Sequence, residues 1–337
     1  MRRTKMKERY SAHAIVEAAL MAALIVVFSL MASYVPIIVP LFIFIAPIPI
    51  VVLNIKYNYK VGIGAVLVSA VIIGIFSGVF NAIMPLILYA PCGLILGVCI
   101  RKNKKTSYTA VILTITNIIS IIVYSTVYLY LLMNMTFMKW ADETIKLIQD
   151  SLSIYEKMGI NLNSNPAYVQ MMNIDAKMLL MAVPAALVVG AVISSIITYN
   201  IARKVINRLN MNINVQPMIK FADWYIGIKA GAALILIVCI AMFLVQKKVI
   251  YSEYIMGASL SLFSLIMIIS GLTIVDYYLV NKLKMGRVMA GILCVLMVSP
   301  LSVLLLSLGI VDLIFDIRGK DENSIGSALR RRINSKQ

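Results

Sequence analysis

Long apolar runs separated by short polar segments dominate the chain. A helix needs about 20 mostly apolar residues to cross the hydrocarbon core of a bilayer. Nine runs are candidates: 12–33, 35–53, 61–80, 82–100, 107–133, 176–200, 223–245, 254–280 and 288–316. The first eight predict transmembrane helices, so the expected fold class is an all-α polytopic integral membrane protein.

The ninth run, 288–316, carries Ser299-Pro300 at its middle. Proline removes a helix hydrogen bond and bends or breaks the helix there. Each half then extends about 18–24 Å, which is short for a full crossing. This favours a C-terminal re-entrant or tilted helical hairpin after eight spans, and nine single spans are the alternative.

Composition excludes several classes of protein. Of the 337 residues, 61% are hydrophobic and only 13% are charged, whereas soluble domains are about half apolar and a quarter charged. A soluble enzyme, a disulfide-rich secreted domain and a disordered chain are therefore excluded. The net charge of +17 would suggest nucleic acid in a soluble chain, but here the cations lie between apolar runs. We therefore interpret the charge as a signal of membrane topology and expect no nucleic-acid partner.

The distribution of basic residues predicts the orientation, because lysine and arginine gather on the cytoplasmic side. With the N-terminus inside, eight spans place 18 basic residues in inner segments and six in outer ones. The tail adds six more, which lie inside if 288–316 is a hairpin and outside if it crosses once. The 24-to-6 distribution predicts that both termini are cytoplasmic.

Residues 134–177 interrupt the membrane part on the predicted outer side. Met138, Ala141, Ile145, Ile148, Leu152 and Tyr155 recur at alternating spacings of three and four, which predicts an amphipathic helix. Asn161–Pro166 follows as a predicted turn. Two interpretations stay open: a helix on the outer membrane surface and a lid over an outward-facing pocket.

The second run is unusual because Pro36, Pro40, Pro47 and Pro49 interrupt it. Four prolines in so short a segment predict a broken helix. Irregular backbone at membrane depth is tolerated where protein buries it or where it lines a wet cavity. A kinked, packed helix and a cavity-lining segment are the two alternatives.

Polar residues within the spans are the candidate site residues, because such groups are costly in lipid. His13 and Glu17 lie four apart and predict a pair on one helix face. An inner-face charge layer is predicted from His13, Glu17, Lys229, Asp276, Asp312 and Asp316. A possible outward-facing pocket is predicted from Asn81, Asn117, Tyr124 and Tyr128.

Small residues at four-residue spacing let membrane helices approach closely. Ala18 and Ala22 on the first span form such a stripe, with Gly93 and Gly97 another on the fourth. Internal packing is the ordinary role of these stripes. A docking face for another membrane protein is the alternative role for Ala18 and Ala22.

Familiar catalytic and cofactor motifs are absent from the sequence. The four cysteines lie within predicted spans, no Cys-x-x-Cys occurs, and there is one histidine, so no metal site or disulfide is expected. A Gly-Lys-Ser/Thr phosphate loop, a Gly-x-Ser-x-Gly elbow and a His-Glu-x-x-His helix are also missing. We expect no catalytic residue, no cofactor and no ATPase in this chain.

Three segments carry a family resemblance. They are Pro91–Lys105 with the sequence PCGLILGVCIRKNKK, Phe221–Tyr225 with FADWY, and Leu308–Arg318 with LGIVDLIFDIR. Together with the proline-rich second run, they resemble the YybS-type bacterial membrane proteins, a family of unknown function. This resemblance implies a multi-pass protein of the bacterial cytoplasmic membrane.

The first six spans are more distantly similar to the substrate-binding S components of energy-coupling-factor transporters. Those have six helices, with both ends inside, and an Ala-x-x-x-Ala face on the first helix that docks onto a partner. Ala18-Ala-Leu-Met-Ala22 is similar to that face. The long segment 134–177 and the spans after residue 200 depart from the pattern.

The expected organisation is an N-terminal six-helix bundle (1–200, including 134–177), C-terminal membrane helices (201–316) and a basic cytoplasmic tail (317–337). Two functions are compatible with it. One is a small-solute-binding transport subunit without its own ATPase. The other is a non-transporting membrane scaffold or regulator that binds a membrane or cytoplasmic partner. The lipid bilayer is the expected surrounding in both cases.

Overall fold

The computed structural model describes residues 12–35, 37, 39–157, 169, 172–211, 213, 215–218, 221–298, 300–320 and 326. The N-terminal basic residues, the turn at Asn161–Pro166, Pro36, Ser299 and most of the tail therefore lie outside the described residues. Within the described part the chain is helical and contains no strand. The expected all-α class is confirmed.

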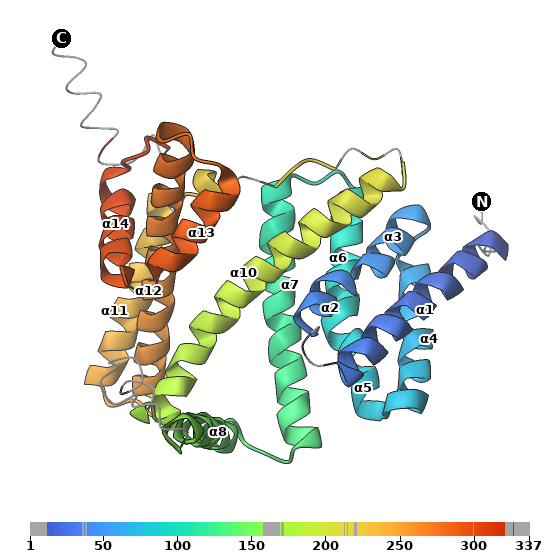
Figure 1. Cartoon of the computed structure of the whole chain (residues 1–337), viewed down its shortest axis with the longest axis horizontal. Coiled ribbons are helices and arrows are strands. Elements are labelled where there is room, and N and C mark those ends of the chain that lie inside the picture. The colour runs from blue at the N-terminus through green and yellow to red at the C-terminus, as the bar shows by residue number, and fades with distance from the viewer. Residues whose placement is uncertain are drawn as a thin grey trace, which may run out of the picture. The chain divides into compact units, whose positions relative to one another are not determined.

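The helices begin and end close to the apolar runs (Figure 1). The first half consists of α1 (Ala12–Tyr34), α2 (Val39–Ile45), α3 (Ile48–Lys56), α4 (Tyr59–Ser77), α5 (Val79–Met84), η2 (Pro85–Tyr89), α6 (Ala90–Arg101), α7 (Thr106–Val127) and η3 (Tyr128–Leu132). The second half consists of α8 (Phe137–Lys157), α10 (Ala176–Arg208), η4 (Phe221–Asp223), α11 (Ile228–Gln246), α12 (Ser252–Tyr277), η5 (Tyr278–Lys282), α13 (Arg287–Val298) and α14 (Ser302–Phe315).

Seven of the described helices are long and apolar enough to cross a membrane. They are Ala12–Tyr34, Tyr59–Ser77, Val79–Arg101, Thr106–Leu132, Ala176–Arg208, Ile228–Gln246 and Ser252–Lys282. The remaining expected span, the proline-rich run, is the shorter apolar stretch Leu41–Lys56, interrupted by a turn at Ala46–Pro47. The structure therefore has the architecture of a multi-pass membrane protein, with seven candidate spans and a broken, shorter apolar stretch in place of the expected second one.

The helices α13 and α14 are bent by 108° against each other where the sequence has Ser299-Pro300. A straight ninth helix is excluded by this bend. A re-entrant hairpin and a broken single crossing both have this geometry.

The chain divides into two compact units. Unit 1 comprises residues 1–135 and 190–218, and unit 2 comprises residues 136–189 and 219–337. Helix α10 contributes its first part to unit 2 and its second part to unit 1. The expected organisation into segments 1–200, 201–316 and 317–337 stays a prediction.

In unit 1, close packing of α3 against α6 forms part of the core. A Cβ atom on Gly93 would lie 2.7 Å from Cβ of Ile50 and 2.8 Å from the carbonyl oxygen of Pro47, so only glycine fits there. At Gly97 an added Cβ would meet the side chain of Asn54 at 2.8 Å. The stripe of Gly93 and Gly97 therefore serves internal packing.

In unit 2, α14 packs along α12. A Cβ atom on Gly271 would collide with the carbonyl group of Leu305, and one on Gly309 would collide with the carbonyl group of Met267. The two glycines therefore let the backbones of α12 and α14 touch. The second half of the predicted hairpin is a firmly packed part of this unit.

The amphipathic helix predicted within 134–177 is present as α8 (Phe137–Lys157). Its Ala141 and Ile145 are buried in a cluster with Ala176 of α10. Asp175 caps the start of α10, since its Oδ1 accepts a hydrogen bond of 2.6 Å from the backbone N–H of Met178. The side chain of Tyr155 lies outside the described residues.

Candidate functional site

A basic loop joins α6 to α7 in unit 1. Asn103 has φ of +48°, a left-handed conformation that asparagine tolerates better than most residues. The backbone N–H of Asn103 donates to the carbonyl oxygen of Ile100, and that of Lys104 donates to Cys99, both at 3.0 Å. This pair of bonds is a Schellman ending of the helix. It turns the chain sharply, so that Lys104 and Lys105 lie directly before the first turn of α7.

The segment that follows α10 lies against this loop and is tied to α10. The hydroxyl of Tyr199 donates a hydrogen bond of 2.8 Å to the carbonyl oxygen of Gln216. Nε of Arg203 donates to the carbonyl oxygen of Val215 at 2.9 Å. Val215 is itself buried in the apolar core of unit 1. These contacts give residues 215–216 a defined position although they belong to no helix.

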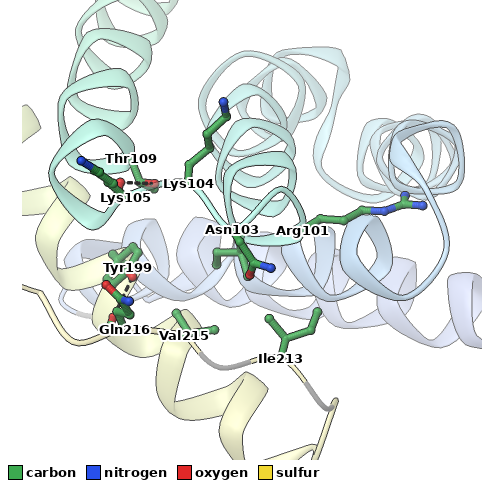
Figure 2. Close-up of a pocket in the computed structure, with 10 residues that line it drawn as sticks. Arg101, Asn103, Lys104, Lys105, Thr109, Tyr199, Ile213, Val215 and Gln216 are labelled. Carbon is green, nitrogen blue, oxygen red and sulfur yellow. Dashed lines mark hydrogen bonds between the residues drawn. The ribbon is translucent and has the colours of Figure 1, made fainter.

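The loop and the segment enclose a hollow of about 370 Å³. We call it the basic hollow; it is lined by Ile100, Arg101, Asn103, Lys104, Lys105, Thr109, Tyr199, Ile213, Val215 and Gln216. Figure 2 shows Tyr199, Val215, Gln216 and Thr109 around it, with Arg101, Lys104 and Lys105 pointing outward in three different directions. The cations therefore form an adjustable rim over a more rigid, polar wall.

The two segments that form the basic hollow carry positive charge only. Segments 98–110 and 199–218 contain seven cations and no aspartate or glutamate. We call these cations the basic end of unit 1: Arg101, Lys102, Lys104, Lys105, Arg203, Lys204 and Arg208. Among the described residues, none of the seven forms an ion pair with an acid. Their field therefore favours an anion at this end of the unit.

A small charged cluster lies beside the basic hollow in unit 1. Nε2 of His13 lies 3.0 Å from Oε1 of Glu17, as the spacing of four predicts. Glu17 also pairs with Lys56, and its Oε2 accepts a hydrogen bond of 2.9 Å from the hydroxyl of Tyr57. The Arg101 guanidinium donates to the carbonyl oxygen of Tyr57 at 3.0 Å. This acid is therefore already neutralised by its own neighbours.

Asn117 is buried, with 7% of its surface exposed. Its Nδ2 donates a hydrogen bond of 2.8 Å to Oγ of Ser195, which joins α7 to the part of α10 that belongs to unit 1. Tyr124 and Tyr128 stack on each other, with 5.9 Å between ring centroids. Asn81 on α5 is exposed, and its Nδ2 donates a hydrogen bond of 2.8 Å to the carbonyl oxygen of Ser77, the last residue of α4. The structure therefore does not bring Asn81 together with Asn117, and the pocket of these four residues stays a prediction.

Protein fills the break in the second span. Ala46 and Ile50 on either side of the turn are buried in a cluster with Tyr89. Asn54, one helical turn further along, is buried too, and its Nδ2 donates to the carbonyl oxygen of Leu94 at 2.7 Å. This arrangement corresponds to a kinked, packed helix and not to a cavity-lining segment, the other alternative.

Of the stripe of Ala18 and Ala22, Ala22 is buried within unit 1, and the docking face stays a prediction. Ala22 is 2% exposed and packs against Leu53 and Ala65, with Ala18 half-buried beside them. A hollow of about 320 Å³ along α1 and α4 is lined by Ala18 and Ala22 among other residues. The buried position of Ala22 corresponds to internal helix packing.

Unit 2 contains most of the predicted inner-face acids. We call Asp223, Asp312, Asp316, Arg318 and Lys320 the paired cluster. The side chains of Arg318 and Asp312 are 0% and 1% exposed, and Nη2 of Arg318 lies 2.8 Å from Oδ2 of Asp312. Nη1 of Arg318 also donates to the carbonyl oxygen of Ala222 at 3.2 Å.

Lys320 completes the paired cluster, with Nζ 2.9 Å from Oδ1 of Asp223. Its backbone N–H donates to Oδ1 of Asp316 at 2.9 Å. Within the described part of the chain, Asp276 forms no ion pair with Lys229 or Arg287, so the predicted layer is not a single network. The same part holds no group of three or more histidine, cysteine or acidic residues able to bind a metal.

Sequence reasoning did not identify several of the residues that the structure brings together. Tyr199, Thr109 and Gln216 form the wall of the basic hollow, and Asn54 bridges α3 to α6. Tyr199 and Thr109 lie within apolar runs, and no spacing or motif in the sequence marks them. The absence of acids around residues 98–110 and 199–218 was the available signal.

Comparison with known proteins agrees with the architecture. The model of a family described as "Predicted membrane protein (DUF2232)" matches residues 23–313. The chain is 28% identical to the uncharacterized protein YybS of Bacillus subtilis (strain 168) over 327 residues, covering 91% of this chain and 98% of that protein. No solved structure matches. The likeness of the first six spans to transporter S components therefore has no support from these comparisons, whereas the YybS-type resemblance is confirmed. With most of its length matched and its multi-pass helical architecture established, the chain belongs to the DUF2232 family of predicted membrane proteins.

Proposed function

We propose that this protein is a non-transporting membrane scaffold or regulator, with no catalytic centre of its own, which binds an anionic partner at the basic end of unit 1. The observation that carries this proposal is the charge around the basic hollow: seven cations, no acid in the same segments, and a wall held by Tyr199 and Arg203. Such a surface attracts negatively charged partners and orients them as they approach.

The proposal includes an orientation. Under the positive-inside rule the basic end of unit 1 and both termini lie in the cytoplasm. The partner is then a cytoplasmic protein or the cytoplasmic part of a membrane protein. A reporter fused after residue 337 tests this topology, and activity of a reporter that works only outside the cytoplasm would contradict it.

Two observations favour a scaffold over a solute-transport subunit. The turn in the second span is filled by Ala46, Ile50 and Tyr89 rather than lining a cavity. Asn117, the deepest candidate ligand, uses its amide group to bind Ser195. A transport subunit needs polar groups that face a ligand-sized space between its helices. Here apolar side chains fill the turn, and the amide of Asn117 binds another helix.

Photocrosslinking in native membranes tests the proposal directly. A photoreactive residue at exposed Lys102, beside the basic hollow, is expected to form an adduct with a partner protein. Neutralising the rim with Arg101→Gln, Lys104→Gln and Lys105→Gln should abolish that adduct, and added salt should weaken it. The matched control is the same probe at exposed Lys282 of unit 2.

Two results would contradict the proposal. One is the absence of any adduct at Lys102, and the other is an adduct that survives neutralisation of the rim. A small solute that co-purifies with the wild-type chain and is lost in Asn117→Leu would instead favour transport.

A further inference from the structure

We infer that the basic hollow is a binding site for a phosphate group, carried either by a soluble compound or by a lipid headgroup. The inference rests on the proposed function, because it uses the same cations as the proposed protein partner and adds a phosphate ligand in the hollow that they line. The hollow of about 370 Å³ is within the size range of small-molecule pockets, about 300–1,000 Å³.

The charges around the hollow select an anion with several oxygens. Arg101, Lys104 and Lys105 line the basic hollow, and in Figure 2 their charged ends point away from it in three different directions. A carboxylate has two oxygens and one charge, whereas a phosphate group offers more acceptor oxygens and up to two charges. Arginine and lysine are the residues that proteins use most for phosphate, arginine as a two-pronged donor and lysine as a point charge.

The side chains of Arg101 and Lys104 are exposed, and their contacts with Tyr57 and Tyr108 involve no acid. Lys104 lies over the ring of Tyr108, with 5.6 Å from Nζ to the ring centroid. Arg101 donates to a backbone carbonyl, and its side chain is exposed. Neither contact neutralises a charge, so an entering phosphate would meet two cations without a competing carboxylate.

The start of α7 adds to the same field. Lys105 occupies the N-cap position of this 22-residue helix, and its side chain makes no capping hydrogen bond. A lysine cannot accept a bond from the first-turn N–H groups, unlike the serine, threonine, aspartate or asparagine usual at this position. The helix dipole and those N–H groups therefore add positive potential at the side of the hollow lined by Lys105 and Thr109.

The polar wall supplies the remaining recognition. Asn103 and Gln216 line the hollow with amide side chains, which donate hydrogen bonds to phosphate oxygens. Tyr199 is nearly fully buried, and its hydroxyl is engaged with the carbonyl oxygen of Gln216. It therefore positions Gln216 and is not itself a ligand.

The test uses the full-length chain in nanodiscs of phosphatidylcholine, which has no net charge, with inorganic pyrophosphate as the soluble probe. Calorimetric titration is expected to show saturable binding. The triple variant Arg101→Gln, Lys104→Gln, Lys105→Gln should bind at least about tenfold more weakly, the effect of losing one charge-assisted hydrogen bond. Substituting arginine for Lys104 and Lys105 should keep the affinity.

A matched control removes the same charge elsewhere. Lys282, Lys284 and Arg287 are exposed in unit 2, and their replacement by glutamine should leave pyrophosphate affinity unchanged. A second arm uses nanodiscs with added phosphatidic acid and counts lipids retained by each variant in native mass spectrometry. If lipid retention depends on Arg101, Lys104 and Lys105 and pyrophosphate does not bind, then a lipid headgroup carries the phosphate.

The inference is overturned if the wild type binds neither probe, or if the triple variant and the unit 2 control bind equally well. If the adduct at Lys102 persists in that case, only the phosphate assignment fails and the partner-binding function stands. If the wild type binds neither probe and the adduct at Lys102 is also absent, the proposed function fails as well.

Discussion

The basic end of unit 1 and the paired cluster of unit 2 differ in whether their cations have acidic partners. Both gather charged residues where helices end. In the paired cluster, Arg318 and Lys320 have Asp312 and Asp223 as partners, and the first pair is fully buried. At the basic end, seven cations lie in segments without one acid. The difference teaches that charge is neutralised within the fold at the paired cluster, whereas among the described residues the cations of the basic end have no acidic partner.

Breaking the buried pair should have the largest effect on stability. Arg318→Met leaves the carboxylate of Asp312 buried without its partner, and we expect a loss of about 3–5 kcal/mol in the free energy of unfolding. Thermal unfolding in nanodiscs measures it. The control Arg101→Met removes an exposed cation of unit 1 and should cost about 0.5 kcal/mol or less.

The double variant Asp312→Leu with Arg318→Met sharpens this test. Replacing both partners by apolar residues removes the uncompensated charge, so much of the lost stability should return. A single variant as stable as the wild type would show that the paired cluster does not support the fold.

The next largest effect is expected where α14 touches α12. Gly309→Leu forces a side chain against the carbonyl group of Met267, which should cost about 1–3 kcal/mol or more. Gly291→Leu on α13 is the matched control, because no atom lies within 4 Å of an added Cβ there. Equal stability of the two variants, measured by thermal unfolding, would contradict the close packing of α14.

A smaller loss is expected in the interior of unit 1. Asn117→Leu removes the hydrogen bond to Ser195 and should cost about 1–2 kcal/mol. Leu131→Ala, at a position 73% exposed, is the comparison and should change the unfolding free energy less. Equal losses would indicate that the bond between Asn117 and Ser195 contributes nothing measurable.

The smallest effect on stability should come from the rim of the basic hollow. Replacing Lys104 and Lys105 with glutamine should change the unfolding free energy by about 0.5 kcal/mol or less per substitution, because both side chains are exposed. Binding of an anion should nevertheless fall. A clear stabilisation of the chain by these changes would point to repulsion among the cations as their main effect.

Much of the fold could be predicted from the sequence, because the signals are local. Most of the long apolar runs became helical segments whose ends lie within a few residues of the expected ones, as α1 and α12 illustrate. Helix α10 is an exception, because it continues to Arg208. Pro47 and Pro300 stand at breaks in the helices, since proline removes a hydrogen bond wherever it occurs. His13 and Glu17 pair because four residues are about one helical turn.

The candidate site was less predictable, because it depends on which helices become neighbours. Glu17 meets Lys56 and Tyr57 some 40 positions away, and Asn117 meets Ser195 78 positions away. Ala22 was a small residue in a stripe, and only the packing of α1 showed that its side chain is buried. Hydrophobic periodicity carries no information on such pairs.

By itself, the sequence determined that this is a multi-pass helical membrane protein, where its spans lie, and that its cations outnumber its acids. Those properties follow from side-chain transfer into lipid and from helix geometry, which act residue by residue. Only the tertiary structure decided that Arg318 is buried against Asp312 while Arg101, Lys104 and Lys105 line a hollow. The physical reason is that charge is local to a residue, but its neutralisation depends on what the fold places beside it.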